Sequence, residues 1–457
     1  MDFSNPKNTA TNSNNEHLLF NLAPIMGKKV ELSFTSPDIS SDGGLLLLKE
    51  CESRIGIIKS ITSCLTDARN PAYIRHTYEE MITQRVFQIA AGYEDADDCD
   101  SLKSDNILKI CTGRLPSDLD LASQPTMSRF ENAVTKRELL RASLAIVDGF
   151  IKSYAAEPTI IILDADDTNS DAYGGQQGCL FNDYYNEYCF MPLHIYEGLS
   201  GKLITTVLKP GRRSKNVDVF IIMAHLIKRL RRCWKKVKIV VRGDSHFCSH
   251  QLMDWCQGID NVSFITGLAG NSVLKGLSAS AVKTAKNQFK QTKQPVKLYH
   301  SFEYKAGSWQ NAQRVIVKVE VSDRGENIRY IVTDMREWRT RQLYELGYCA
   351  RGAMELRIKE HKTYLKSDRM SCSQFNANQF RLFMHSAAYV LIHTLQTETL
   401  KGTQFATATF KTIREKIIKV AAYVKEMKTK IQIQLPASCP QIAAFSQCLL
   451  LFEFLRT

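Results

Sequence analysis

A run of apolar, mainly β-branched residues that ends in acids is the feature that most restricts the possible folds of this chain. It reads Thr159-Ile160-Ile161-Ile162-Leu163-Asp164, and its composition predicts a strand buried on both faces. Before this run, from Leu45 to Ala155, apolar residues recur at helical spacing. The pattern therefore changes from helical to α/β at about residue 156.

Four more strands and two helices are expected after this first strand. The strands are predicted near Phe190–Tyr196, Leu203–Leu208, Lys238–Arg242 and Val262–Gly267, and the helices at Val217–Trp234 and Ser249–Cys256. The resulting order, β-β-β-α-β-α-β, is that of a ribonuclease-H-like α/β core with a mixed five-stranded sheet. We expect its first part at 156–271.

The rest of the chain divides by composition. Strand-like alternation at Arg314–Val321 and Ile328–Val332 predicts a β-rich insertion over 272–341. Long helices at Gln342–Leu365 and Phe375–Thr397 would form the second part of the core, 342–397. The remaining segments are expected to be a mobile arm (1–30), a helical N-terminal region (31–155) and a basic, helical C-terminal region (398–457).

Charge and cysteine usage limit the classes of function. The formal net charge of +13 favours an anionic partner, with nucleic acid first and an anionic membrane second. No stretch approaches the ~20 apolar residues of a membrane helix, and no signal peptide is recognisable, which predicts an intracellular protein. The 13 cysteines form no CxxC pair, which excludes zinc-ribbon and thioredoxin-type motifs.

Two candidate catalytic acids follow predicted strands. On the first strand, Asp164 and Asp166 share one face, and we favour Asp166 because Asp166-Asp167-Thr168 has the form Asp-x-Thr; Asp164 is the alternative. Asp244 directly follows the fourth strand, where open α/β sheets place functional groups. Taken singly, either position also fits an ordinary polar exit from a strand.

The third candidate acid lies on a predicted helix. Tyr348, Arg351, Glu355 and Lys362 are separated by three, four and seven residues, which places them on one helical face, whereas Glu360 points away. Glu355 is therefore the predicted third acid. The alternative is an exposed amphipathic helix with a solvated Glu/Arg pair.

These residue types suit phosphoryl transfer. Three carboxylates, Asp166, Asp244 and Glu355, can bind two Mg²⁺ ions ~4 Å apart, and Mn²⁺ can substitute. Basic and aromatic side chains can hold the DNA phosphates and bases. The predicted DNA-contacting residues are Tyr348, Arg351, Lys362, Arg242, Thr126, Arg129 and Trp309.

Several of these predictions have alternatives. Thr126 and Arg129 could equally belong to a helix cap. Trp309 fits a packed β-subdomain as well as a base-stacking site. His246, two residues after Asp244, is interpreted as a polar loop residue outside the triad.

The chain resembles bacterial insertion-sequence transposases of the DDE superfamily. Tyr348, Arg351, Glu355 and Lys362 match, without a gap, the signature Tyr-x2-Arg-x3-Glu-x6-Lys of the insertion-sequence 4-like branch. Further segments are similar to the insertion-sequence 1380 group, and the likeness extends over roughly 37–393. These segments are Ser41–Leu47, Gln124–Asn132, Leu180–Tyr185, Arg242–Ser245 and Arg357–Glu360.

The resemblance implies a cut-and-paste transposase with a helical DNA-binding region at 31–155. Such an enzyme cleaves at the ends of a mobile element and transfers the 3′-hydroxyls into target DNA. The implied partners are double-stranded DNA, both terminal inverted repeats and target, and a second copy of the chain in a homodimer. The implied location is the bacterial cytoplasm, on the nucleoid and not on a membrane. The alternatives are an inactive or co-opted DNA-binding descendant and a ribonuclease-H-like nuclease.

Overall fold

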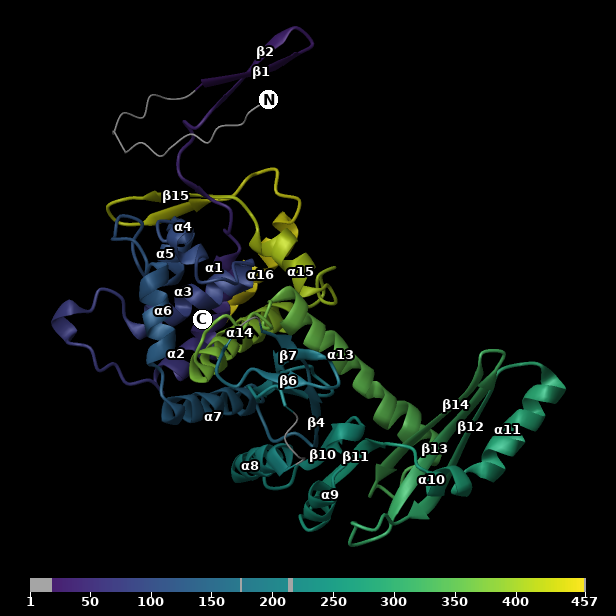
Figure 1. Cartoon of the computed structure of the whole chain (residues 1–457). Coiled ribbons are helices and arrows are strands. Elements are labelled where there is room, and N and C mark those ends of the chain that lie inside the picture. The colour runs from purple at the N-terminus through teal and green to yellow at the C-terminus, as the bar shows by residue number, and fades with distance from the viewer. Residues whose placement is uncertain (1–18, 173–174, 213–216, 456–457) are drawn as a thin grey trace, which may run out of the picture.

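An eight-stranded mixed sheet forms the lower half of the molecule in a computed structural model that describes residues 19–172, 175–212 and 217–455 (Figure 1). The strands lie in the order β12-β13-β14-β11-β10-β4-β8-β9. They are β4 (Ile160–Asp167), β8 (Leu193–Glu197), β9 (Leu203–Val207), β10 (Lys238–Gly243), β11 (Val262–Leu268), β12 (Val296–Tyr304), β13 (Gln313–Ser322) and β14 (Gly325–Thr333).

Each of the five strands predicted from the sequence is present. β10 is parallel to both β4 and β11; on the other side of β4, β8 runs antiparallel to β4, and β9 runs antiparallel to β8 and hence parallel to β4. A small three-stranded sheet that the sequence did not predict lies between β4 and β8 in the chain. Its strands are β5 (Ser170–Asp171), β6 (Leu180–Asn182) and β7 (Glu187–Phe190).

Alternate side chains of β4 enter two different cores, as the period of two requires. Ile161 and Leu163 pack in a cluster with α7 (Lys136–Lys152), α8 (Val217–Cys233) and α9 (His250–Gln257). Ile160 and Ile162 pack on the opposite face, beside the helical segment that begins at Thr340. Helices therefore cover both faces of the central strands, which explains why β4 reads as a continuous apolar run.

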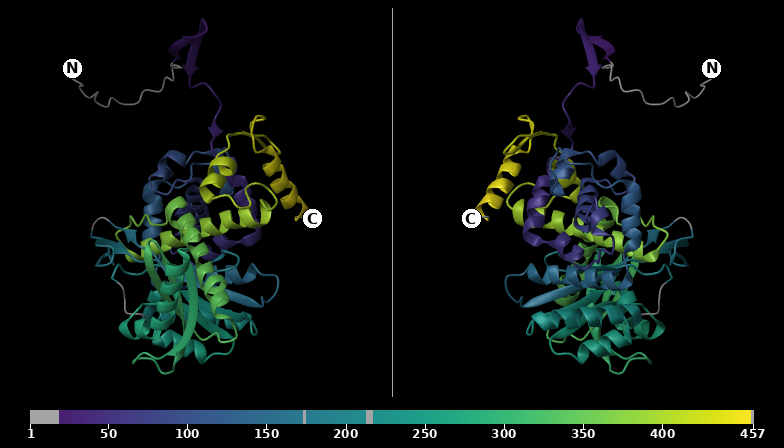
Figure 2. Two further views of the ribbon diagram at one scale, coloured as in Figure 1. Left: turned by 90° about the vertical axis from the view of Figure 1, so that its right-hand side faces the viewer. Right: turned by 90° about the vertical axis from the view of Figure 1, so that its left-hand side faces the viewer.

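Helices from both ends of the chain form one body above the sheet (Figure 2). The long, buried helix α14 (Phe375–Thr394) packs against α3 (Tyr78–Ala91) and shares one hydrophobic core with the N-terminal helices. The regions predicted separately at 31–155 and 398–457 are thus parts of one core. The other helices are α1 (Leu45–Ile55), α2 (Ile57–Thr62), α3 (Tyr78–Ala91), α4 (Asp98–Leu102), α5 (Asn106–Cys111), α6 (Gln124–Ala133), α15 (Phe410–Ile413) and α16 (Ile442–Phe454).

Capping boxes fix the starts of two of these helices. Thr77 and Glu80 exchange side-chain to backbone hydrogen bonds at the start of α3, and Thr135 and Glu138 do the same at the start of α7. Each box satisfies amide groups that have no partner within the helix. These two starts are therefore encoded locally.

The segment Ser41–Leu47 joins the two ends of the chain. The amides of Gly43 and Gly44 donate to the backbone oxygens of Val420 and Ile418. A Cβ atom on Gly44 would lie only 1.9 Å from the backbone oxygen of Ile417, so no larger residue fits there. Packing therefore explains the glycine at position 44 in the segment Ser41–Leu47, which is one of the segments similar to the insertion-sequence 1380 group.

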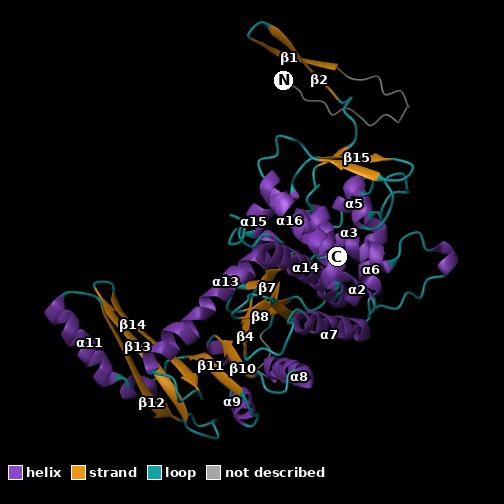
Figure 3. Ribbon diagram, turned by 180° about the vertical axis from the view of Figure 1, so that it is seen from behind, coloured by secondary structure: helices purple, strands orange, loops and turns teal. Residues whose placement is uncertain are grey.

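The predicted insertion at 272–341 extends the main sheet instead of forming a separate one. β14 pairs with β11, and β13 and β12 continue from it (Figure 3). Two helices, α10 (Ser272–Leu277) and α11 (Ala279–Thr292), precede these strands, so the segment is less purely β than expected. The alternation at Arg314–Val321 is that of β13, whose inward side chains are all buried.

Both termini contain strands where the sequence predicted none. Within the expected mobile arm and just beyond it, β1 (Leu19–Ile25) and β2 (Lys28–Ser33) form an exposed hairpin that projects from the helical body; residues 1–18 lie outside the described residues. The C-terminal region is helical only in part. After α15, β15 (Ala422–Glu426) pairs with β16 (Ile431–Gln434) and with β3 (Ile39–Ser40). One partner of β15, the strand β3, comes from a distant segment, which a local pattern does not reveal.

The predicted helix at Gln342–Leu365 is one helical segment from Thr340 to Tyr364. Its α-helical parts are α12 (Thr340–Gln342) and α13 (Gly352–Lys359). Leu343–Tyr348 and Glu360–Tyr364 are π-helical, and Cys349–Arg351 is a 3-10 turn. The wider π-helical turns change the angular spacing of side chains along this segment.

Across the described parts of the chain, none of the helices has the length and apolar character needed to span a membrane.

Candidate active site

The alternative first acid, Asp164, is held in a buried ion pair. Arg242 donates to both oxygens of its carboxylate, with Nη2 2.6 Å from Oδ2, and also donates to the backbone oxygen of Gly347. Both charged side chains are only 2% exposed. A Cβ on Gly198 would lie 2.8 Å from the Asp164 carboxylate, so the glycine makes room for the pair. Arg242 is thus enclosed, which corrects its predicted role as a DNA contact.

Asp166, the favoured first acid, lies nearer the surface and has a different partner. Nη2 of Arg351 is 2.7 Å from its Oδ2. Burial raises the pKa of Asp166 to about 6; Arg351 opposes this rise, and the nearby charges of Asp244 and Asp167 add to it. Asp166 and Asp244 are therefore close enough to repel each other.

The register of two parallel strands explains this closeness. Arg242 on β10 lies opposite Asp164 on β4, so Asp244, two residues later, emerges beside the end of β4 that carries Asp166. The Asp244 carboxylate accepts the backbone N–H of His246, and its Oδ2 lies 2.9 Å from the His246 Nδ1. Gly267 on the neighbouring strand leaves space for the Asp244–Ser245 backbone and for the hydroxyl of Tyr348. These contacts fix the direction in which Asp244 points.

Lysines bind the end of β4 and the loop that follows it. Lys209 pairs with Asp167, with 2.7 Å between Nζ and Oδ2. Lys362 donates to the backbone oxygen and the side-chain oxygen of Asn169, at 2.5 and 2.9 Å. Sequence reasoning identified Lys362 but missed Lys209 and Asn169. Asn169 directly follows the Asp166-Asp167-Thr168 run and could have been suspected on that ground.

The helical segment 340–364 brings three of its four predicted residues to the ends of β4 and β10. Tyr348 lies beside Gly267 and Asp244, Arg351 binds Asp166, and Lys362 binds Asn169. The fourth, Glu355, is exposed, and no hydrogen bond or ion pair joins it to another described residue. Among the described residues, no three acidic, histidine or cysteine side chains gather closely enough to hold a metal ion.

Asp166 and Asp244 have the chemistry that a divalent cation requires. Both offer hard carboxylate oxygens, and burial, with the nearby charges of Asp244 and Asp167, raises the pKa of Asp166. Glu355 does not join them in this structure. The two aspartates therefore fit the metal expected from the sequence, whereas the third ligand is not assembled.

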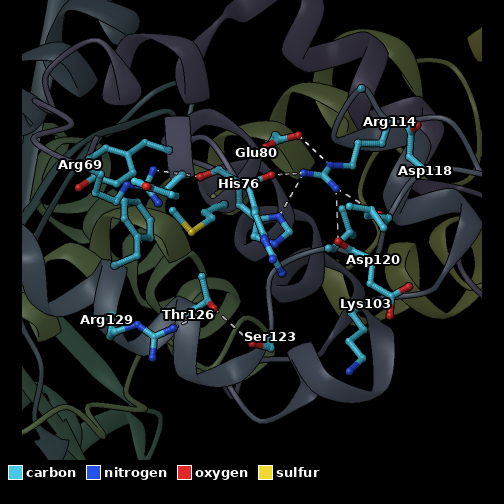
Figure 4. Close-up of a pocket in the computed structure, with 18 of the residues that line it drawn as sticks. Arg69, His76, Glu80, Lys103, Arg114, Asp118, Asp120, Ser123, Thr126 and Arg129 are labelled. Carbon is cyan, nitrogen blue, oxygen red and sulfur yellow. Dashed lines mark hydrogen bonds and ion pairs between the residues drawn. The ribbon is translucent and has the colours of Figure 1, made fainter. Parts of the chain in front are cut away.

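The predicted DNA contacts outside this region have different surroundings. Trp309 is only 8% exposed and packs edge-on against Tyr304, so it belongs to the core, and its predicted role in base stacking is corrected. Thr126 and Arg129 line an open groove of about 1410 Å³ in the helical body, where the Arg129 guanidinium donates to the Thr126 hydroxyl (Figure 4). These two residues remain accessible.

Paired aspartates beside a basic helical segment, on an α/β sheet, are typical of enzymes that act on phosphodiesters. The family model for the transposase DDE domain, group 1, matches residues 22–456. This match spans nearly the whole chain, and the chain belongs to this family of DNA transposases. It is therefore an enzyme that binds, cleaves and joins DNA, and enzymes of this family generally use divalent metal ions.

Comparisons with solved structures and with curated proteins add no stronger match. Among solved structures, the chain is similar to a piggyBac transposase in a synaptic complex with hairpin DNA, with 12% identity and a TM-score of 0.44. That likeness covers 83% of this chain and 80% of the other. No curated protein matches the sequence.

Proposed function

We propose that this transposase moves an element by cut and paste, and that Asp166, Asp244 and Glu355 are its catalytic acids. The observation that carries the proposal is the placement of Asp166 and Asp244 at the ends of adjacent parallel strands, close enough for Asp244 to raise the pKa of Asp166. Mutual repulsion of this kind is typical of carboxylates that share a cation. Asp164 is not proposed as the first acid, because Arg242 already neutralises it.

The catalytic core is proposed to be ribonuclease-H-like. The supporting observation is the part of the sheet ordered β9-β8-β4-β10-β11, in which β8 alone is antiparallel and β9, β4, β10 and β11 run in the same direction. The matches to the insertion-sequence 4-like signature and to segments of the 1380 group support placing the enzyme in that bacterial branch.

Glu355 is proposed as the third acid because of its neighbours on the helical segment. Arg351 precedes Glu355 in the chain and contacts the end of β4. Lys362 follows Glu355 and contacts the loop after β4. Glu355 lies between these two anchors, one α-helical turn from Arg351. A shift of this segment when DNA binds would be needed to bring Glu355 to the aspartates.

The side chains have distinct proposed roles. Bound Mg²⁺ or Mn²⁺ would supply activation of the attacking water or 3′-hydroxyl and stabilisation of the leaving oxygen. Arg351 would release Asp166 and bind a DNA phosphate instead. Its planar guanidinium can hold a phosphate with two hydrogen bonds. Lys362 would hold a second phosphate, Tyr348 would contact the same strand, and His246 would orient Asp244.

The proposed partners are the terminal inverted repeats, the target DNA and a second copy of the chain. An element has two ends, and a two-fold symmetric dimer would provide one active site for each.

An end-cleavage and strand-transfer assay tests this proposal. A supercoiled donor plasmid carrying the element ends is incubated with the protein, Mg²⁺ and a target plasmid. We expect cleavage at both ends and joining of the 3′-ends to the target. Binding without cleavage would identify a co-opted DNA-binding protein, and cleavage without joining or end preference would identify a nuclease; either result would contradict the proposal.

A further inference from the structure

The small sheet between β4 and β8 in the chain exposes a cluster of large apolar side chains. We call β6, the turn 183–186 and β7 the aromatic hairpin. Between 41% and 71% of each of four of its side chains is exposed, namely Leu180, Phe181, Tyr184 and Tyr188. Exposed apolar side chains that lie together, rather than singly, mark surfaces that contact another molecule. The hairpin includes the segment Leu180–Tyr185, which the catalytic acids leave unexplained.

The rings of the aromatic hairpin pack against one another instead of entering a core. Phe181 and Tyr188 are cross-strand partners with ring centroids 5.4 Å apart, and the rings of Tyr184 and Tyr185 lie 4.9 Å apart. Both pairs meet edge to face, an arrangement that covers only one ring face in each pair. The exposed rings therefore keep faces on which a further aromatic system can stack.

A buried asparagine holds the turn of the aromatic hairpin in shape. The side-chain oxygen of Asn182 accepts the backbone N–H groups of Tyr184 and Tyr185, at 3.0 and 3.3 Å. The amide group of Asn182 donates to the backbone oxygen of Gly211 at 2.7 Å. Asn186 has a positive φ of 55°, a conformation that asparagine adopts more readily than most residues. The tyrosines therefore lie on a fixed turn, which lowers the entropic cost of binding a ligand.

The aromatic hairpin adjoins the proposed catalytic aspartates. It lies between α14 and β4 (Figure 1, Figure 3). The Tyr184 ring meets the His246 ring edge-on, with 6.4 Å between their centroids, and His246 contacts Asp244. Glu187 accepts a hydrogen bond from Asn169, in the loop that follows β4. One strand of DNA advances ~3.4 Å per nucleotide, so the Tyr184 ring lies within about three nucleotides of Asp244.

The charges of the aromatic hairpin favour bases over phosphates as its ligand. Residues 180–190 contain the acids Asp183 and Glu187 and no lysine or arginine. Negative charge repels the phosphate backbone, whereas aromatic rings stack on bases of any sequence. Arg351 and Lys362, on the helical segment 340–364, provide the positive charge for the phosphates. A protein bound to this hairpin would obstruct DNA at Asp244, because the rings lie beside that residue.

Bases inside an intact duplex cannot stack on these rings, because neighbouring base pairs cover both of their faces. A base becomes accessible where its pair opens, and stacking on an aromatic ring offsets part of the cost of unpairing. We propose that Phe181, Tyr184 and Tyr188 bind unpaired bases beside the scissile phosphate. The inference rests on the proposed transposase function and names the part of the DNA that its site recognises. It assigns to the aromatic hairpin a base contact that the buried Trp309 cannot make.

The test compares two double variants that each remove two exposed aromatic rings. The hairpin variant carries Tyr184→Ala and Tyr188→Ala. The control carries Phe34→Ala and Trp338→Ala, whose rings are exposed outside the hairpin. A third protein, with Tyr184→Phe and Tyr188→Phe, keeps both hairpin rings. Each protein is titrated with a labelled element-end duplex that is either fully paired or mispaired beside the cleavage point. Fluorescence anisotropy in EDTA gives both dissociation constants without cleavage, and circular dichroism verifies folding.

We expect wild type and control to bind the mispaired duplex at least about tenfold more tightly than the paired duplex, because stacking is gained without the cost of unpairing. The hairpin variant should bind both duplexes with similar affinity, and the phenylalanine variant should keep the wild-type preference. Equal binding of both duplexes by wild type would overturn the inference and point to a protein partner. A hairpin variant that kept the preference would also overturn it.

The outcome is independent of the cleavage proposal, because the assay measures no catalysis. Loss of the inference would leave the roles of the acids standing. Failure of cleavage, with the preference for mispaired DNA intact, would leave the base contact standing.

Discussion

Asp166→Asn and Asp244→Asn are each expected to slow end cleavage by at least about a thousandfold, which corresponds to ~4 kcal/mol of transition-state stabilisation. An amide cannot supply the negative charge that a divalent cation requires. The rate is measured by single-turnover cleavage of a DNA end in Mg²⁺, with DNA binding checked separately. Cleavage within tenfold of wild type by either variant would remove that residue from the catalytic set.

The same substitutions should leave the fold intact. The pKa of Asp166 is raised to about 6, so its ionised form destabilises the folded state, and this penalty develops as the pH rises from the ordinary value of 3.8. At neutral pH the Asp166→Asn protein should therefore be at least as resistant to urea as wild type. A large loss of stability would mean that Asp166 has a structural role.

Asp164→Asn should produce the opposite result, with a large loss of stability. It would leave the Arg242 guanidinium buried without a carboxylate, since both members of the pair are 2% exposed. Breaking a buried ion pair in this way typically costs about 3–5 kcal/mol. Equilibrium unfolding in urea measures the loss.

A matched control for Asp164→Asn is available on the surface. Glu303→Gln breaks the exposed pair with Arg336, whose side chains are 49% and 64% exposed, and should cost no more than about 1 kcal/mol. If Asp164→Asn cost as little, the pair would not anchor β4 to β10. If it kept its fold and lost only cleavage, Asp164 would be the first catalytic acid after all.

The sequence predicted the part of the site that regular strands determine. The apolar runs at β4 and β10 defined the strands, and the parallel register then brings Asp166 and Asp244 together. It could not separate Asp164 from Asp166, because a period of two places both on one face. Only the tertiary contact with Arg242, 78 positions away, distinguishes them.

The position of the third acid, Glu355, could not be predicted from helical spacing alone. Spacing of three, four and seven residues places Tyr348, Arg351, Glu355 and Lys362 together on a uniform α-helix. In the structure, π-helical turns at Leu343–Tyr348 and Glu360–Tyr364 interrupt that uniformity. Tyr348, Arg351 and Lys362 reach the strand ends, and Glu355 remains exposed.

Other differences arise from contacts between distant segments. Arg242 is enclosed with Asp164, and Trp309 belongs to a hydrophobic core that it shares with other strands and helices of the main sheet. The strands β12–β14 join the main sheet because the edge of β11 is free to pair with β14. The strand β15 pairs with β3, near the start of the chain, as well as with the neighbouring strand β16.

The central claim, that Asp166, Asp244 and Glu355 jointly bind the catalytic cations, is tested most directly by Mn²⁺ binding. Electron paramagnetic resonance counts the Mn²⁺ bound to the protein with an uncleavable DNA end, for wild type and for Glu355→Gln. The account predicts two ions per chain in wild type and weaker or fewer ions in the variant. Unchanged binding by Glu355→Gln, or no specific binding by the wild-type complex, would contradict it.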